Sequence, residues 1–216
     1  MLQTFVETTK NLYMERIILR PTNPDSRDIE RVAKQVNDGA LVIFPTDTVY
    51  AIGCIMTNKN SIEKLIKVTG KREKQAKLSL ICKDLKSVAD YTLPYSNHVF
   101  KTMKRYLPGP YTFILNANTF VTRYFKNNKR EIGIRIPDNK IINELAEYAN
   151  APIICTSLNH DEDKDYYTNP SNIEEDFQHK VEYLLDGGLG DTEGSTILDC
   201  TGDSIEIMRQ GKGPVD

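Results

Sequence analysis

Residues 41–54 have the sequence LVIFPTDTVYAIGC, an apolar run that leads into a short polar segment. The first four residues are apolar throughout, which is typical of a strand buried on both faces of a sheet. Pro45 ends the run, and three short hydrogen-bonding side chains follow at Thr46, Asp47 and Thr48. Such strand-end loops are where α/β sheets bind ligands, although the same residues also serve in ordinary turns. The stretch predicts a strand that carries a candidate site at its end.

Segments of strand type recur along the whole chain and alternate with helical patterns. Besides 41–45, we expect strands at 15–20, 78–82, 111–117, 132–137, 151–157, 195–201 and 205–210. Apolar residues spaced three and four apart predict helices at 25–39, 60–68, 97–107 and 138–149, with Asn60, Asn97 and Asp138 as N-caps of the last three. The last two strands are joined across 201–204, too tightly for a helix, so the sheet should be mixed and the fold α/β.

The composition is that of an ordinary globular chain. The 216 residues include 28 basic and 30 acidic residues, and 39% are hydrophobic. No apolar run is long enough to span a membrane, and residues 1–16 have no apolar signal core. We therefore expect a cytoplasmic protein, with an N-terminal lead-in at 1–25 and a single domain at 26–213. The four cysteines are scattered through apolar segments, which predicts buried reduced thiols and no metal site.

Residues 70–77, GKREKQAK, place four cations in eight positions of a chain whose net charge is −2. The segment contains a Gly-Lys pair but is not a Walker A loop. Leu65 occupies the position of the first glycine, and Arg72 occupies that of the magnesium-binding Ser or Thr. Taken alone, the segment is best interpreted as a solvated charged loop between two elements.

Other strand ends carry hydroxyls and arginines. The candidates are Thr112, Arg135, Thr156, Ser157, Asn159, Ser195, Thr196 and Arg209. Each residue alone is weak evidence for a ligand site, since an arginine can form a core ion pair and a serine can cap a turn. Together with the basic segment, and without a prominent His, Cys or carboxylate pair, they favour a site for an anionic, oxygen-rich ligand such as a nucleotide.

Seven motifs of the chain occur in an order that resembles the order in the YrdC-like family. They are PTDTVYAIG, KREKQAKLSLI, PGPYTFIL, IGIRIPDN, PIICTSLN, STILD and MRQGKG, and the likeness extends over about residues 26 to 213. This family includes the threonylcarbamoyl-AMP synthases, which act in making threonylcarbamoyladenosine in tRNA. The resemblance implies a twisted open mixed sheet with flanking helices and a large basic cavity.

The resemblance also implies a reaction and its site residues. L-threonine, bicarbonate and ATP would form threonylcarbamoyl-AMP and pyrophosphate, with Mg²⁺ arriving on ATP and no tightly bound cofactor or protein metal ligand. Lys71 and Arg72 would be catalytic, Lys77, Thr112, Ser157, Asn159 and Arg209 would bind nucleotide and phosphate, and Thr46, Thr48 and Ser195 would bind threonine, with possible support from Arg135, Thr156 and Thr196. No protein nucleophile is needed, because cationic clamps and positioning stabilise such a transfer.

The chain departs from the family pattern at two places. Gly70 stands where the family has the lysine of its Lys-x-Arg pair, and acidic residues 161–163 follow the Ser-x-Asn motif. These departures resemble the YciO branch, so a divergent member with another adenylate or carbamoyl chemistry remains an alternative. An RNA-binding module is the alternative from another class, because a basic concavity and tyrosines also suit nucleic acid. The expected partners are thus the three substrates, and possibly tRNA or tRNA-modification proteins, with no membrane.

The two interpretations of the basic segment predict different effects of single substitutions. If the segment binds phosphate, Arg72→Ala should weaken ATP binding about tenfold or more, because it removes a charge-assisted contact. Lys74→Ala, which removes the same charge two residues away, should have a much smaller effect. Calorimetric titration of ATP into both variants measures this, and equal effects would favour the solvated loop.

Overall fold

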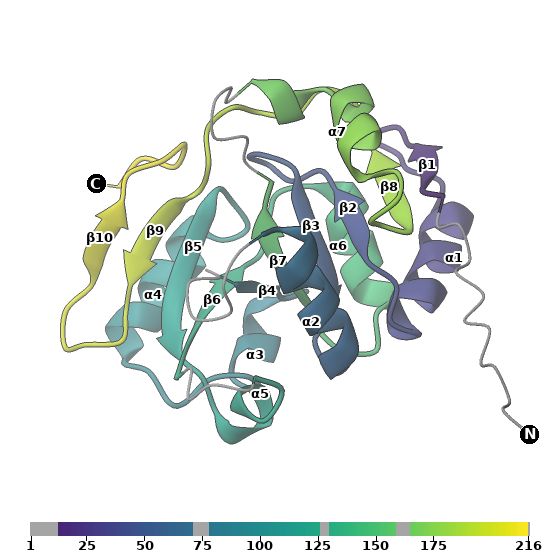
Figure 1. Cartoon of the computed structure of the whole chain (residues 1–216). Helices are drawn as coiled ribbons and strands as arrows, with labels where there is room; N and C mark the ends of the chain where they lie inside the picture. The colour runs from purple at the N-terminus through teal and green to yellow at the C-terminus, as the bar shows by residue number, and fades with distance from the viewer. Residues whose placement is uncertain (1–12, 71–77, 126–129, 159–164, 216) are drawn as a thin grey trace, which may run out of the picture.

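The computed structural model describes residues 13–70, 78–125, 130–158 and 165–215. In these ranges ten strands form one sheet, in the order β1-β8-β2-β3-β7-β4-β6-β5-β9-β10 (Figure 1). Parallel and antiparallel pairs both occur, for example β4 with β6 and β5 with β6 respectively. The predicted fold, a twisted open mixed α/β sheet with flanking helices, is confirmed.

The strands are short, and their bounds follow the apolar runs. They are β1 Glu15–Ile18, β2 Val42–Phe44, β3 Ala51–Ile55, β4 Ser79–Ile81, β5 Tyr111–Asn116, β6 Glu131–Arg135, β7 Ile153–Ser157, β8 Tyr183–Asp186, β9 Thr196–Asp199 and β10 Glu206–Arg209. All eight predicted strands are present, and β9 and β10 form the expected antiparallel hairpin. The two strands that were not predicted are β3, which directly follows the polar loop, and β8, in which Leu184 and Leu185 are the only aliphatic residues.

The helices are α1 Ser26–Asn37, α2 Lys59–Val68, α3 Leu85–Val88, α4 Asn97–Tyr106, α5 Thr119–Thr122, α6 Lys140–Tyr148 and α7 Pro170–Phe177, with one 3₁₀ turn η1 at Tyr166–Thr168. The predicted N-caps of α2, α4 and α6 were wrong by one or two residues. The side chains that accept the first free N–H groups belong to Asn58, Ser96 and Asn139. In each case an equally suitable polar residue lies next to or near the predicted one, so composition alone could not distinguish them.

The two faces of the sheet are covered differently. One face packs against α2 and α4 and is apolar across the sheet, with Cys54, Leu80 and Phe113 among its buried side chains. The other face packs against α1 and α6, and its buried residues come mainly from the half of the sheet that contains β1, β8, β2, β3 and β7. The remaining half of this second face, over β4, β6, β5 and β9, is where space for a ligand remains.

All four cysteines are buried and free, as predicted. Burial raises the pKa of the Cys82 thiol to about 12, so this thiol is protonated at neutral pH. Within the described ranges, no helix is both long and apolar enough to cross a bilayer. No group of three or more potential metal ligands is found in that part of the chain either.

Gly39 ends α1 in the left-handed conformation that its position after the helix predicts. Its φ is +105°, and a Cβ built there would lie 2.5 Å from Asn58 Nδ2 and 2.8 Å from Ser61 Oγ. Gly188 also has a positive φ, of +89°, but a Cβ there would meet nothing within 4 Å. Both positions require a positive φ, which glycine adopts without strain. Only at Gly39 would an added Cβ also meet neighbouring side chains.

Gly39→Ala should therefore destabilise the protein more than Gly188→Ala does. Backbone strain should cost each variant about 1 kcal/mol, and displacement of the Asn58 cap should cost Gly39→Ala about 1 kcal/mol more. Urea unfolding with an unchanged denaturant slope measures both. Equal losses would show that Asn58 and Ser61 adjust freely to the added methyl group.

Candidate functional site

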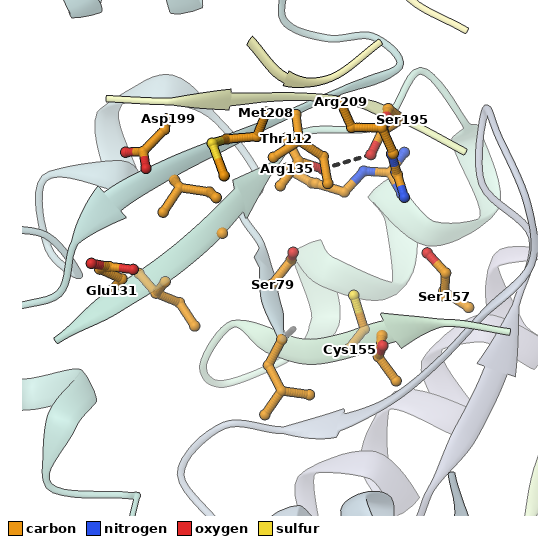
Figure 2. Close-up of a pocket in the computed structure, with 17 residues that line it drawn as sticks. Ser79, Thr112, Glu131, Arg135, Cys155, Ser157, Ser195, Asp199, Met208 and Arg209 are labelled. Atoms are coloured by element: carbon orange, nitrogen blue, oxygen red, sulfur yellow. Dashed lines mark hydrogen bonds between the residues drawn. The ribbon is translucent and has the colours of Figure 1, made fainter. Parts of the chain in front are cut away.

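A cavity of about 580 Å³ lies on the open half of the sheet's second face (Figure 2). Its volume is within the range of small-molecule sites. Seven neighbouring strands contribute to it, and the lining residues are Ala51, Leu78, Ser79, Thr112, Ile114, Glu131, Ile132, Gly133, Arg135, Cys155, Thr156, Ser157, Ser195, Ile197, Asp199, Met208 and Arg209. Much of the lining is therefore fixed by backbone hydrogen bonds of a continuous sheet.

Strand register explains why the middle of this face is hollow. Gly133 of β6 is paired with Ser79 of β4 and with Ile114 of β5, and Ser79 is paired with Cys155 of β7. Paired residues point to the same face, so Gly133, Ser79 and Cys155 lie in one row across the cavity floor. All three are small residues. A Cβ on Gly133 would clash with Ser79 Oγ, and it would reduce the space in the middle of the row.

A buried ion pair lies beside the cavity, between Arg135 and Asp47. One guanidinium nitrogen, Nη2, donates to Asp47 Oδ1 at 2.7 Å, and the two side chains are only 5% and 9% exposed. The other carboxylate oxygen of Asp47 accepts the backbone N–H of Asp138 at 3.0 Å. Lys212 donates to the backbone carbonyl of Asp47 at 2.8 Å. The loop after β2 is thereby tied to β6 and to the C-terminal segment.

The two threonines of this loop form a series of hydrogen bonds that begins at Arg135. Thr46 Oγ1 donates to the Val49 carbonyl at 2.8 Å, so its single proton is used there. The 3.0 Å contact between the Thr46 and Thr48 hydroxyls must then be donated by Thr48. Thr48 Oγ1 in turn accepts from Arg135 Nη2 at 3.1 Å. In this series of hydrogen bonds, both threonine hydroxyl protons point away from the guanidinium. This arrangement fixes the orientation of Arg135.

Arg209 approaches the same end of the cavity from β10. Its Nη2 and Nε donate to the Ser195 carbonyl at 2.6 and 3.2 Å. The Ser195 hydroxyl lies 2.8 Å from that of Thr112 (Figure 2). Burial lowers the pKa of the Arg209 guanidinium, and the positive charge of Arg135 lowers it further. Arg135 and Arg209 repel each other, and the hydroxyls of Ser195 and Thr112 line the same cavity. Such a site is suited to an anion.

Cys155 lines the cavity but is not suited to act as a nucleophile. The side chain is buried, and this burial raises the pKa of its thiol to about 12. At neutral pH the thiol is therefore protonated, whereas the thiolate is the reactive form.

The structure brings together six of the predicted site residues on the cavity wall. These are Thr112, Arg135, Thr156, Ser157, Ser195 and Arg209. Three others do not line it: Thr46 and Thr48 lie behind Arg135, and Thr196 is fully buried, with its hydroxyl bonded to the N–H of Gly211 and the carbonyl of Gly213. Lys71, Arg72, Lys77 and Asn159 lie outside the described residues, so their predicted roles stay predictions.

Four further polar or polarisable residues line the cavity and were not among the predicted ones. They are Ser79, Glu131, Asp199 and Met208. Glu131 lies four residues before Arg135 on β6, and Asp199 lies four residues after Ser195. Period-two counting from the predicted residues along each strand could have found these two. Asp47 was noted in the loop, but its pairing with Arg135 joins segments 88 residues apart, which the sequence does not show.

An open mixed sheet with a hydroxyl-rich cavity that is basic at one end places the chain among α/β proteins with a cavity on one sheet face. Within this class the chain belongs to the Sua5/YciO/YrdC family. The family model, described as "Telomere recombination", matches residues 34–211. This confirms the resemblance to the YrdC-like family.

Individual relatives agree with this membership. The chain is 31% identical to the uncharacterised protein YciO of Escherichia coli K12, over 91% of this chain and 95% of that one. The crystal structure of E. coli YciO matches with a TM-score of 0.86 at 30% identity, over 93% and 97% of the two chains. Pyrococcus abyssi Sua5 in complex with L-threonine matches with a TM-score of 0.83 at 25% identity, over 92% of this chain and 58% of that one.

Removing Asp47 should reveal how much the buried ion pair contributes to stability. Asp47→Ala leaves the Arg135 charge buried without its carboxylate, which should lower the free energy of unfolding by about 3 kcal/mol. Glu30→Ala breaks the exposed Lys34–Glu30 pair, whose side chains are 69% and 47% exposed, and should change stability by less than about 1 kcal/mol. Chemical denaturation of both variants tests the difference. Similar small losses would mean that water or another group replaces Asp47.

Proposed function

We propose that this protein is a nucleotidyltransferase of the threonylcarbamoyl-AMP synthase type. Its substrates would be L-threonine, bicarbonate and ATP, and its products threonylcarbamoyl-AMP and pyrophosphate, for threonylcarbamoyladenosine formation in tRNA. The observation that carries the proposal is the basic end of the cavity, where Arg135 and Arg209 meet the hydroxyls of Thr112 and Ser195. The likeness to a Sua5 structure that contains L-threonine supports it at the level of the family.

In this proposal the basic end receives the charged groups of both substrates. Arg135 is held rigidly by Asp47 and Thr48, so little reorganisation is needed when an anion arrives. The Ser195 and Thr112 hydroxyls can each donate to a carboxylate or phosphate oxygen by rotating away from one another. The amino-acid carboxylate and the α-phosphate would thus be held side by side.

The reaction itself requires few groups from the protein. Threonine and bicarbonate condense to a carbamate with loss of water, and the carbamate oxygen attacks the α-phosphate of ATP while the bond to pyrophosphate breaks. Arg209 and the cations predicted at 71, 72 and 77 would stabilise the negative charge that moves to the leaving group. Mg²⁺ would come with ATP and be held mainly by its phosphates.

The departure at Gly70 keeps the YciO-type alternative open. Gly70 follows α2 with φ of +65°, a conformation that disfavours a lysine side chain at this position. The YciO match also covers nearly the whole length of that chain, whereas the Sua5 match covers 58%. A YciO-type member would retain the cavity and lack the threonine-dependent reaction, and an RNA-binding role would show as binding that weakens steeply with salt.

The reaction can be tested by pyrophosphate release. With ATP, Mg²⁺ and bicarbonate present, L-threonine should raise the rate at least about tenfold over no amino acid, because its carbamate is the group that displaces pyrophosphate. Serine and valine serve as comparison substrates. A rate that is the same with and without threonine contradicts the synthase proposal.

Ser195→Ala sharpens this test, because it removes one hydroxyl from the basic end and leaves the backbone carbonyl that Arg209 uses. We expect kcat/KM for threonine to fall about tenfold or more. Ser204→Ala, in the exposed β9–β10 turn, is the matched control and should leave the rate unchanged. Equal rates for the two variants would remove Ser195 from the threonine site.

A further inference from the structure

A segment of nine residues, 187–195, crosses the molecule from β8 to β9. Six other strands lie between β8 and β9 in the sheet, so a segment this short must take a direct course. Figure 1 shows it running along one edge of the sheet, at the top of the view. Its last residue, Ser195, lines the cavity, and the Ser195 carbonyl accepts two hydrogen bonds from Arg209. The course of this crossing segment therefore affects where Arg209 is held.

The half of the crossing segment that follows β8 is fixed by hydrogen bonds to buried or half-buried residues. The hydroxyl of Tyr50, a buried residue, donates to the Gly188 carbonyl at 2.7 Å and accepts the N–H of Gly187 at 3.1 Å. The N–H of Gly190 donates to the Thr168 carbonyl at 2.8 Å. Beyond Gly190, the segment is joined to the rest of the molecule by an ion pair.

Lys212 holds the second half of the crossing segment. Its Nζ pairs with Asp191 Oδ2 at 2.7 Å, and its backbone N–H donates to the Gly194 carbonyl at 3.0 Å. The same Nζ donates to the Asp47 carbonyl at 2.8 Å. Asp47 is also the residue whose carboxylate pairs with Arg135. One side chain thus connects the segment that supports Arg209 with the loop that supports Arg135.

The ion pair between Lys212 and Asp191 is partly exposed. The two side chains are 42% and 33% exposed, and pairs of this kind usually contribute little to the stability of a fold. The hydrogen bond from Lys212 lowers the pKa of the Asp191 carboxyl, so both groups are charged at neutral pH. A charged pair that contributes little to folding can still fix the relative positions of the two segments that it joins.

We propose that Lys212 is a positioning residue for the reaction proposed above. Lys212 does not line the cavity and acts through its contacts with Asp47 and the crossing segment. These contacts set the distance between the guanidinium groups of Arg135 and Arg209. That distance determines how the carbamate and the α-phosphate are aligned, and a displacement of about 1 Å can slow a reaction about a hundredfold. The inference rests on the proposed function, in that it takes the two arginines to hold the reacting groups.

Lys212→Met tests the proposal, because it removes the ammonium group and keeps an unbranched side chain. In the pyrophosphate-release assay we expect kcat to fall about tenfold or more. The KM values for threonine and ATP should each change less than about threefold, because each substrate keeps its own contacts. The midpoint of thermal unfolding should change little, since the pair is partly exposed. Lys34→Met, which breaks the exposed Lys34–Glu30 pair of α1, is the matched control and should keep the wild-type kcat.

Asp191→Asn tests the route by which Lys212 acts. Asp191 Oδ1 accepts the N–H groups of Thr192 and Glu193, and asparagine retains an oxygen for them. The charge that faces Lys212 is lost, so kcat should fall here as well. In the double variant with Lys212→Met, kcat should be no lower than in the slower single variant, because both changes break the same contact.

The outcomes separate this inference from the proposed function. If Lys212→Met leaves kcat unchanged, Lys212 does not align the reacting groups, and the inference is wrong whether the unfolding midpoint falls or a KM rises. If the losses in kcat multiply in the double variant, Lys212 does not act through Asp191, and the inference is equally wrong. In both cases the proposed function stands. If the wild-type protein shows no threonine-dependent release of pyrophosphate, the proposed function fails, and the inference fails with it.

Discussion

The buried ion pair between Arg135 and Asp47 is the interaction on which the site depends. A charge on β6, at the edge of an uncovered part of the sheet, is stable there because the loop after β2 brings a carboxylate to within 2.7 Å. That loop is itself held by Asp138 and Lys212, so segments from three distant parts of the chain meet at one carboxylate. The pair satisfies one side of the guanidinium and leaves Nε without a partner in the described structure. In the proposed function, stability and ligand binding thus use the same arginine.

The sheet supplies the rest of the arrangement through register alone. Helices α1 and α6 cover one half of the second face, and small residues at Gly133, Ser79 and Cys155 keep the other half hollow. Because alternate residues of each strand face the cavity, one strand presents both a basic and an acidic side chain, Arg135 and Glu131. A cavity with opposite charges at its two ends is a direct consequence of this repeat. It provides a rigid binding surface without requiring a helix N-terminus or a glycine-rich loop.

The sequence predicted the fold, and six of the predicted site residues line the cavity, for physical reasons. Apolar runs and tight turns determine strands locally, and hydroxyls or arginines at strand ends are visible one motif at a time. The sequence did not predict β8, in which Leu184 and Leu185 are the only aliphatic residues. It also assigned Thr46 and Thr48 to the threonine site; in the structure neither lines the cavity, and Thr48 accepts a hydrogen bond from Arg135. Contacts such as Asp47 with Arg135 depend on how distant strands pair, and Glu131 and Asp199 join the cavity through that same pairing.

The most direct measurement of the central claim is a crystal structure of the protein with bound AMP. The account predicts the phosphate between Arg135, Arg209 and Ser195, with an oxygen within hydrogen-bond distance of the Arg209 guanidinium. A phosphate bound beside Glu131 and Asp199, or outside the cavity, would contradict the account.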